Sequence, residues 1–348
     1  MKSKIILENG ETSAGRMFSG PCTGKTGRVI FDTRVVGYEK ILTCPEYRDK
    51  IVCLSYPLIG NYGISYQDTE TDMLYPSGLV ISESSSIYSN FRADLSLAEF
   101  IEGRGMPVLY GADTQHITAM LREKPGIRGL LSNGEHDDRK MMEAINGSVL
   151  SSGYVPPPAC MPEVPAVQED LRGKVIAVIN LGLKKSEMKR LSGSGMSLNV
   201  VNLSSPGAED DISRADGLYI SSGPDSMALL EDACGISERF VGKMPVFGAG
   251  LGHLVVGRLL GSSVSGRMVN HYGVNHPVVD IETGKCFITE QMHSLVLEKK
   301  SLPGKTLKYS HLNDGTPEGL YDHEMKAMSV SFIPQEKHFE AFFSLIKE

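Results

Sequence analysis

Two short segments of the chain place glycine, serine and histidine where they could support acyl-transfer chemistry. Each segment directly follows an apolar run: Ser221-Ser222-Gly223-Pro224 and Gly248-Ala249-Gly250-Leu251-Gly252-His253. A serine hydroxyl attacks a carbonyl only when a neighbouring base activates it, and histidine is the commonest such base. His253 and His293 are candidates by residue type. Neither forms a recognisable pair with the serines, so we do not expect a serine nucleophile.

The cysteines do not indicate a metal site. No pair has Cys-x-x-Cys spacing and no His-x-x-x-His segment accompanies them, so we expect no zinc site and no metal in this chain. We interpret all of them as small buried hydrophobic residues of a reducing compartment. They are Cys22, Cys44, Cys53, Cys160, Cys234 and Cys286. Gly-x-Gly-x-x-Gly is absent around Gly182, so no dinucleotide site is expected.

The overall composition is that of a globular protein with two domains. The chain has 348 residues, of which 41% are hydrophobic and 22% charged, and its formal net charge is -7. This acidic balance argues against nucleic acid or an anionic membrane as partner. No apolar run approaches the roughly 20 residues that cross a bilayer, and the N-terminus lacks a signal-peptide core. We expect a cytoplasmic protein.

The second half alternates between strands and helices. This order predicts a mostly parallel, doubly wound sheet with its functional residues at the carboxyl ends of the strands. Residues 221–226 and 248–253 would lie at that edge. The expected strands are 174–179, 198–203, 217–220 and 245–248, and the expected helices are 185–191, 226–240 and 251–260.

The first half reads as a mixed α/β domain. A strand at residues 4–7 precedes Asn9-Gly10, a strong hairpin signal. Further strands are expected at 28–32, 50–56 and 78–82, and helices at 96–102 and 115–123, the second capped by Thr114. The proline-rich residues 151–172 predict a linker between a domain at 1–150 and another at 173–348.

The segment from Pro245 to His253 resembles the nucleophile elbow of class I glutamine amidotransferases, which carry Gly-x-Cys-x-Gly-His between a strand and a helix. Further segments resemble the small subunit of carbamoyl phosphate synthetase, from about residue 5 to about residue 335. They are Gly37 to Thr43, Tyr56 to Gly63, Ser89-Asn90-Phe91-Arg92, Asp113-Thr114, Leu121 to Lys124, Gly273 to Val278 and Asp314-Gly315-Thr316. The resemblance implies the N-terminal small-subunit domain followed by a class I glutamine amidotransferase-like domain.

The catalytic positions that this resemblance implies have changed. The family hydrolyses glutamine with a cysteine, a histidine and a carboxylate. Gly250 stands in the place of the cysteine, Ile333 in that of the histidine and Gln335 in that of the carboxylate. Glycine has no side chain to attack with, and neither isoleucine nor glutamine is a useful base at neutral pH. We therefore expect no catalytic residues and no glutamine hydrolysis.

The glutamine pocket that the resemblance implies is altered as well. Asp225 adds a carboxylate where the family has glycine, Leu254 replaces a glutamine, and Arg34 stands where a small hydroxyl residue is expected. The degenerate pocket comprises Arg34, Gly223, Asp225, Leu251, Leu254, Met292, Ser294 and Leu295. His253 and His293 do not match the family's base, so a structural role is expected for both.

By resemblance, the partner is the large subunit of a carbamoyl phosphate synthetase, which would hold the ATP and metal ions. No cofactor is expected here, since the chain has no P-loop. The leading hypothesis is a pseudo-glutaminase subunit that supports synthesis from ammonia and bicarbonate. Alternatives are a regulatory or scaffolding homologue, a residual glutamine-dependent subunit, and an enzyme with new chemistry at Asp225, His253 and His293. The pathway served, arginine or pyrimidine biosynthesis, stays open.

Overall fold

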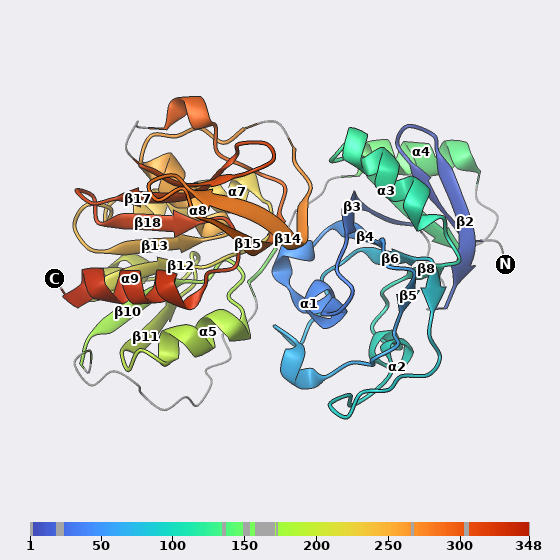
Figure 1. The fold of residues 1–348 in the computed structure, drawn as a ribbon, viewed down its shortest axis with the longest axis horizontal. Coiled ribbons are helices and arrows are strands. Elements are labelled where there is room, and N and C mark those ends of the chain that lie inside the picture. The colour runs from blue at the N-terminus through green and yellow to red at the C-terminus, as the bar shows by residue number, and fades with distance from the viewer. Residues whose placement is uncertain are drawn as a thin grey trace. The chain divides into compact units, whose positions relative to one another are not determined.

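The computed structural model describes residues 3–18, 24–133, 137–148, 154–156, 171, 173–265, 268–302 and 306–347. The chain divides into two compact units, Met1–Tyr154 and Val155–Glu348, and each is described by itself (Figure 1). Most of the predicted linker, residues 151–172, lies outside the described residues.

In the first unit, seven of the described strands close into a barrel in the order β1-β2-β8-β6-β4-β3-β9, and β5 pairs with β7 in a separate small sheet. The predicted hairpin is present: β1 and β2 pair antiparallel around Asn9-Gly10, and Gly10 has a φ of +88°. Apolar side chains such as Ile5, Val29 and Leu131 fill the interior. The bounds are β1 Ser3–Leu7, β2 Thr12–Met17, β3 Lys25–Asp32, β4 Lys50–Leu54, β5 Leu58–Ile59, β6 Gly78–Ile81, β7 Glu83–Ser84, β8 Val108–Tyr110 and β9 Arg128–Asn133.

Four α-helices accompany these strands in the described part of the unit: α1 Tyr38–Thr43, α2 Leu97–Ile101, α3 Thr114–Glu123 and α4 Asp138–Gly147. The predicted cap of α3 was wrong by one residue. Asp113, rather than Thr114, is the N-cap, and its carboxylate accepts a 3.0 Å hydrogen bond from the His116 amide. An aspartate satisfies the free N–H groups there and also complements the positive end of the helix dipole.

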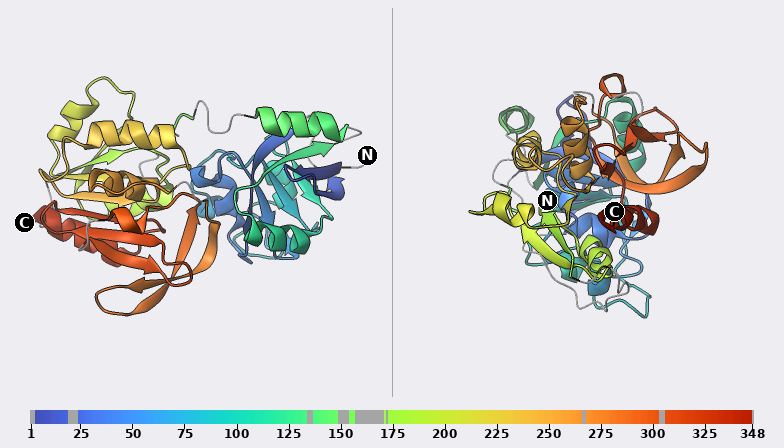
Figure 2. Two further views of the ribbon diagram at one scale, coloured as in Figure 1. Left: turned by 90° about the horizontal axis from the view of Figure 1, so that it is seen from above. Right: turned by 90° about the vertical axis from the view of Figure 1, so that its left-hand side faces the viewer.

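The second unit contains a nine-stranded sheet in the order β11-β10-β12-β13-β18-β17-β16-β14-β15. The first five of these strands run parallel, which confirms the doubly wound fold. The other four form an antiparallel extension that was not predicted, coloured orange to red in Figure 2. The bounds are β10 Val175–Ile179, β11 Ser197–Val201, β12 Gly217–Ile220, β13 Val246–Ala249, β14 His271–Asp280, β15 Cys286–His293, β16 Leu307–His311, β17 Pro317–Asp322 and β18 Ala327–Val330.

Helices cover both faces of this sheet because successive side chains of a buried strand point to opposite faces. Ala177 and Ile179 of β10 belong to a core formed with α6, α7 and α8. Ile176 and Val178 belong to a second core, formed with α5 and α9. The helices are α5 Lys185–Ser192, α6 Ala208–Ser213, α7 Met227–Ser237, α8 Leu251–Leu259 and α9 Glu336–Lys347.

The expectation that all the cysteines are buried was wrong. Cys44 and Cys53 are buried, whereas Cys234 is half-buried and Cys286 is exposed. Cys286 is the first residue of β15, the strand at the edge of the sheet. Cys22 and Cys160 lie outside the described residues. Within the described ranges, no helix has the length and apolar character to span a bilayer.

Candidate functional site

Three neighbouring parallel strands end at one edge of the sheet in the second unit. β12, β13 and β18 are adjacent, with Ile220 opposite Gly248 and Ala249 opposite Val330. Residues 221–226 and 248–253 therefore meet at the carboxyl edge, as the alternating pattern predicted. Residues 331–335, which follow β18, join them there.

The turn between β13 and α8 is packed backbone against backbone. Gly250 caps α8 with φ +54° and ψ −112°, a conformation that suits glycine. A Cβ on Gly248 would lie 2.2 Å from the carbonyl oxygen of Gly252, and a Cβ on Gly252 would lie 2.2 Å from that of Ile220. Glycine at 248 and 252 is thus a steric requirement of the turn.

Ser222 lies directly beside Gly250. A Cβ added at Gly250 would approach the Ser222 Cβ to 2.9 Å. The Ser222 hydroxyl donates to the buried carboxylate of Glu187 at 3.0 Å, and the Tyr219 hydroxyl donates to the same carboxylate at 2.8 Å. Glu187 was not predicted from the sequence, because it lies on α5, 35 residues from Ser222. The hydrogen bond to Glu187 fixes the Ser222 side chain within the turn.

At positions 333 and 335, where the resemblance places the base and the carboxylate, the backbone amides form hydrogen bonds. The Ile333 amide donates to the Glu290 carbonyl oxygen at 3.0 Å, and the Gln335 amide donates to Nδ1 of His338 at 3.0 Å. His338 lies on α9 and is only 2% exposed. Burial lowers its pKa to about 4.

The predicted pocket residues of the second unit divide into an apolar and a polar group. Leu251, Leu254 and Leu295 pack into the core beneath α8, and Met292 is buried. Asp225 accepts hydrogen bonds from the Ser294 hydroxyl at 2.6 Å, from the Ser294 amide at 3.1 Å and from the Tyr272 hydroxyl at 3.0 Å. Tyr272 was not predicted, since it lies 47 residues from Asp225.

Gly223, His253 and Arg34 are each held by close contacts. A Cβ on Gly223 would lie 2.4 Å from the Leu181 carbonyl oxygen. His253 is 1% exposed, its Nδ1 lies 2.9 Å from the Ser329 hydroxyl, and burial lowers its pKa to about 4. Arg34 belongs to the first unit, where its Nε lies 3.0 Å from the carboxylate of Asp32.

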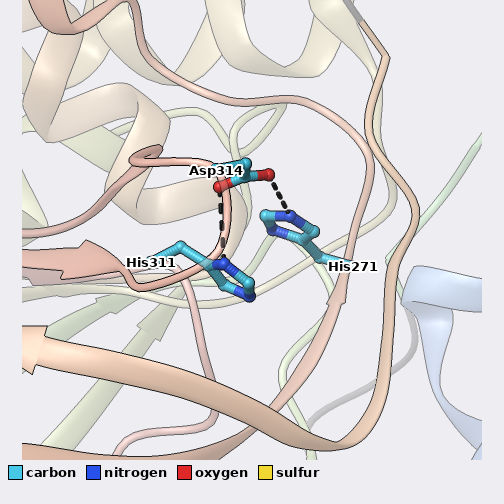
Figure 3. Close-up of side chains that lie close together, drawn as sticks. All are labelled: His271, His311 and Asp314. Carbon is cyan, nitrogen blue, oxygen red and sulfur yellow. Dashed lines mark hydrogen bonds and ion pairs between the residues drawn. The ribbon is translucent and has the colours of Figure 1, made fainter.

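A cluster of buried histidines and carboxylates lies on the antiparallel extension. His271 and His293 are cross-strand partners on β14 and β15, so their side chains project from neighbouring positions. Nε2 of His271 donates to Asp314 at 2.8 Å, and Asp314 also lies 3.4 Å from Nδ1 of His311 (Figure 3). Glu318 of β17 is 0% exposed and lies within 3.5 Å of both His271 and His293.

The charges of this cluster stabilise one another. Burial by itself would lower the pKa of His271, but the hydrogen bond to Asp314 and the charges of Asp314 and Glu318 raise it to about 9. Burial would raise the pKa of Glu318, yet the charge of His293 and the contact with His271 hold it well below its usual range. Burial, followed by repulsion from His271, lowers the pKa of His276 to about 4.

Comparison with known proteins identifies the family. A model of the carbamoyl-phosphate synthase small chain, CPSase domain, matches residues 5–131, and a model of class-I glutamine amidotransferases matches residues 177–341. The chain is 32% identical over its whole length to the carbamoyl phosphate synthase small chain of Bacillus thuringiensis, of which it covers 96%. The chain belongs to the carbamoyl phosphate synthase small chain family.

Other relatives agree with this assignment. The chain is 31% identical to the carbamoyl phosphate synthase pyrimidine-specific small chain of Bacillus subtilis, over 96% of this chain and 91% of the relative. A solved glutamine amidotransferase from Thermotoga maritima is 16% identical, with a TM-score of 0.36, and covers 46% of this chain and 75% of its own. That structural likeness is too limited to support further inference. The recognised family and the two-domain α/β fold are confirmed.

For this family member, introducing a cysteine at position 250 should cost stability. We expect Gly250→Cys to lower the free energy of unfolding by about 1–3 kcal/mol, because a side chain at φ +54° is strained and its Cβ would crowd Ser222. Gly235→Cys on α7 is the matched control, since nothing lies within 4 Å of its added Cβ. Urea unfolding followed by circular dichroism measures both. Equal losses in the two variants would contradict the crowding.

Acid should destabilise this small chain through His338. Its pKa is about 4 in the folded state and about 6.5 when unfolded, so the folded state resists protonation. The stabilisation is complete above pH 6.5 and is lost as the pH falls through 4, by up to about 3 kcal/mol. We expect the decrease in unfolding free energy between pH 6.5 and 4 to be smaller in His338→Gln. An unchanged decrease would show that other groups cause the acid sensitivity.

Proposed function

We propose that this chain is a non-hydrolysing small subunit of a carbamoyl phosphate synthase. In this proposal it associates with an ATP-dependent large subunit, which makes carbamoyl phosphate from bicarbonate and free ammonia. The names of its relatives support the assembly, because a small chain implies a large one. ATP and metal ions for synthesis would be bound by the large subunit. The cytoplasmic location stays a prediction from the sequence.

One observation carries the proposal against glutamine hydrolysis. The residue at the turn between β13 and α8, where the resemblance places a nucleophile, is Gly250. Covalent acyl transfer needs a thiolate or an activated hydroxyl at that point. The hydroxyl beside it, on Ser222, donates to the carboxylate of Glu187 instead of facing a histidine. Ile333 and Gln335 provide no base.

The test is co-expression with the large subunit from the same genome. We expect a complex that forms carbamoyl phosphate with ATP, bicarbonate and ammonia, and that neither hydrolyses glutamine nor uses it as the nitrogen donor. The large subunit alone serves as the control for the contribution of this chain. Glutamine-dependent turnover would refute the loss of hydrolysis and favour a residual amidotransferase. Failure to form a complex would favour a regulatory or scaffolding role.

A further inference from the structure

The buried cluster on the antiparallel extension has two imidazole nitrogens that make no hydrogen bond. These atoms are Nδ1 of His271 and Nε2 of His293. The two residues are 5% and 7% exposed, and their strands pair directly. Buried polar atoms without partners are rare, because each costs free energy of desolvation. Two of them beside one fully buried carboxylate require an explanation.

Both nitrogens face Glu318. Nδ1 of His271 lies 3.3 Å from one carboxylate oxygen, and Nε2 of His293 lies 3.5 Å from the other. In a tetrahedral site with metal–ligand bonds of about 2.0–2.1 Å, neighbouring ligand atoms lie about 3.3–3.4 Å apart. One ligand atom from each of the three residues lies within 4.8 Å of the others. The spacing fits one ion bound by all three.

The outer ring nitrogens orient both histidines as metal ligands. Nε2 of His271 donates to Asp314 at 2.8 Å, and Nδ1 of His293 donates to the carbonyl oxygen of Leu295 at 3.1 Å. With a proton held on the outer nitrogen, the inner nitrogen can bind an ion once its own proton is released. Histidine ligands of zinc show this arrangement, in which the second nitrogen donates to a carboxylate or a backbone carbonyl.

The Glu318 carboxylate is oriented by hydrogen bonds, as metal-binding carboxylates commonly are. It accepts hydrogen bonds from Thr316 at 2.8 Å, from Gln291 at 3.1 Å and from Ser331. These donors fix the direction of the carboxylate in the absence of any ion. Without an ion, a proton on Nδ1 of His271 forms the ion pair with Glu318 at 3.3 Å, and a bound ion would displace that proton.

We propose that His271, His293 and Glu318 form a binding site for a divalent transition-metal ion of the Zn²⁺ class. Two imidazoles and one carboxylate suit Zn²⁺ and leave a fourth position for water. The neighbouring group of His271, His311 and Asp314 (Figure 3) suits an ion less well. Nδ1 of His311 already accepts from the Asn313 amide at 3.3 Å, so that lone pair is occupied. The site does not depend on the proposed synthase role.

The test uses the purified full-length chain without a histidine tag and Zn²⁺ alone as the probe. After treatment with a chelator and dialysis, we expect titration calorimetry and elemental analysis to show one Zn²⁺ bound per chain. His293→Gln should weaken binding by more than about 100-fold, because loss of an outer partner alone costs about 10–100-fold. His338→Gln is the matched control, since it removes a buried histidine of the same unit outside the site, and should bind as the unaltered chain does.

A second variant and a second metal cover the case in which His293→Gln does not fold. Asp314 is 28% exposed, so Asp314→Asn should fold, and we expect it to bind Zn²⁺ about 10–100-fold more weakly. Co²⁺ in place of Zn²⁺ should give the visible absorption of a four-coordinate ion. The proposal is overturned if the folded chain retains no Zn²⁺, if His293→Gln folds and binds as tightly, or if Asp314→Asn binds as tightly.

Discussion

The Arg34→Ala variant is expected to lose about 3–5 kcal/mol of its free energy of unfolding, the cost of breaking a buried ion pair. Asp32 is 0% exposed and Arg34 is 2% exposed, and Nε of Arg34 lies 3.0 Å from the carboxylate. Nη2 of Arg34 also donates to the Tyr47 hydroxyl at 3.0 Å, and that hydroxyl donates to Asp32 at 2.9 Å. Removing the guanidinium leaves the Asp32 charge buried without its cation.

Arg92→Ala is the control for this change. Arg92 forms an ion pair with Asp68 at 2.8 Å, but the two side chains are 45% and 42% exposed. Exposed pairs contribute about 0–1 kcal/mol, so this variant should unfold almost as the unaltered chain does. Chemical unfolding of the unaltered chain, Arg34→Ala and Arg92→Ala would measure the two losses of stability. A similar small loss in both variants would mean that the Arg34 pair is hydrated, and would leave Arg34 available for a role in binding.

The Phe339→Ala variant should lose a comparable amount, about 3–5 kcal/mol, in the second unit. Phe339 is fully buried on α9, with its ring centroid 5.6 Å from that of Phe247 and 6.1 Å from that of Tyr219. The ring therefore joins α9 to the two central strands β12 and β13. Truncation would leave a cavity between the helix and the sheet that these strands cannot fill by relaxing.

Phe91→Ala tests whether this loss comes from burial rather than from the removal of an aromatic ring. Phe91 is 98% exposed, so its truncation should change stability by no more than about 0.5 kcal/mol. Thermal and urea unfolding of both variants provide the comparison. If Phe339→Ala were as mild as Phe91→Ala, α9 would contribute little to the stability of the sheet.

Four of the five parallel strands, all except β18, were predicted from their apolar runs. β12 was predicted with its observed bounds, Gly217–Ile220, and β10 within one residue, since each is a continuous apolar run between polar segments. The antiparallel extension escaped prediction. β14 begins His271-Tyr272-Gly273 and mixes buried with half-exposed positions, and its register shifts between Gly273 and His276. A strand interrupted in this way has no period of two to detect.

Resemblance to the family assigned positions along the chain to a catalytic site, whereas the buried cluster could not be predicted. Gly250 was found because its neighbours along the chain are distinctive. His271, His293 and Glu318 are far apart in the sequence, on three different strands. Only the pairing of β14 with β15 makes the two histidines partners, and only the fold brings β17 alongside. The one available signal was the density of histidine between residues 271 and 311.

The two glycines that the turn requires are explained by the fold and say nothing about catalysis. Positions 248 and 252 admit no side chain, because a Cβ there would enter a backbone carbonyl. A relative that forms this turn must therefore keep both glycines, whether or not it is an active enzyme. The presence of these glycines therefore indicates the fold. It is no chemical evidence for assigning the activity of one homologue to another. The residue at position 250, between the two glycines, is the one that bears on whether the turn can carry a nucleophile.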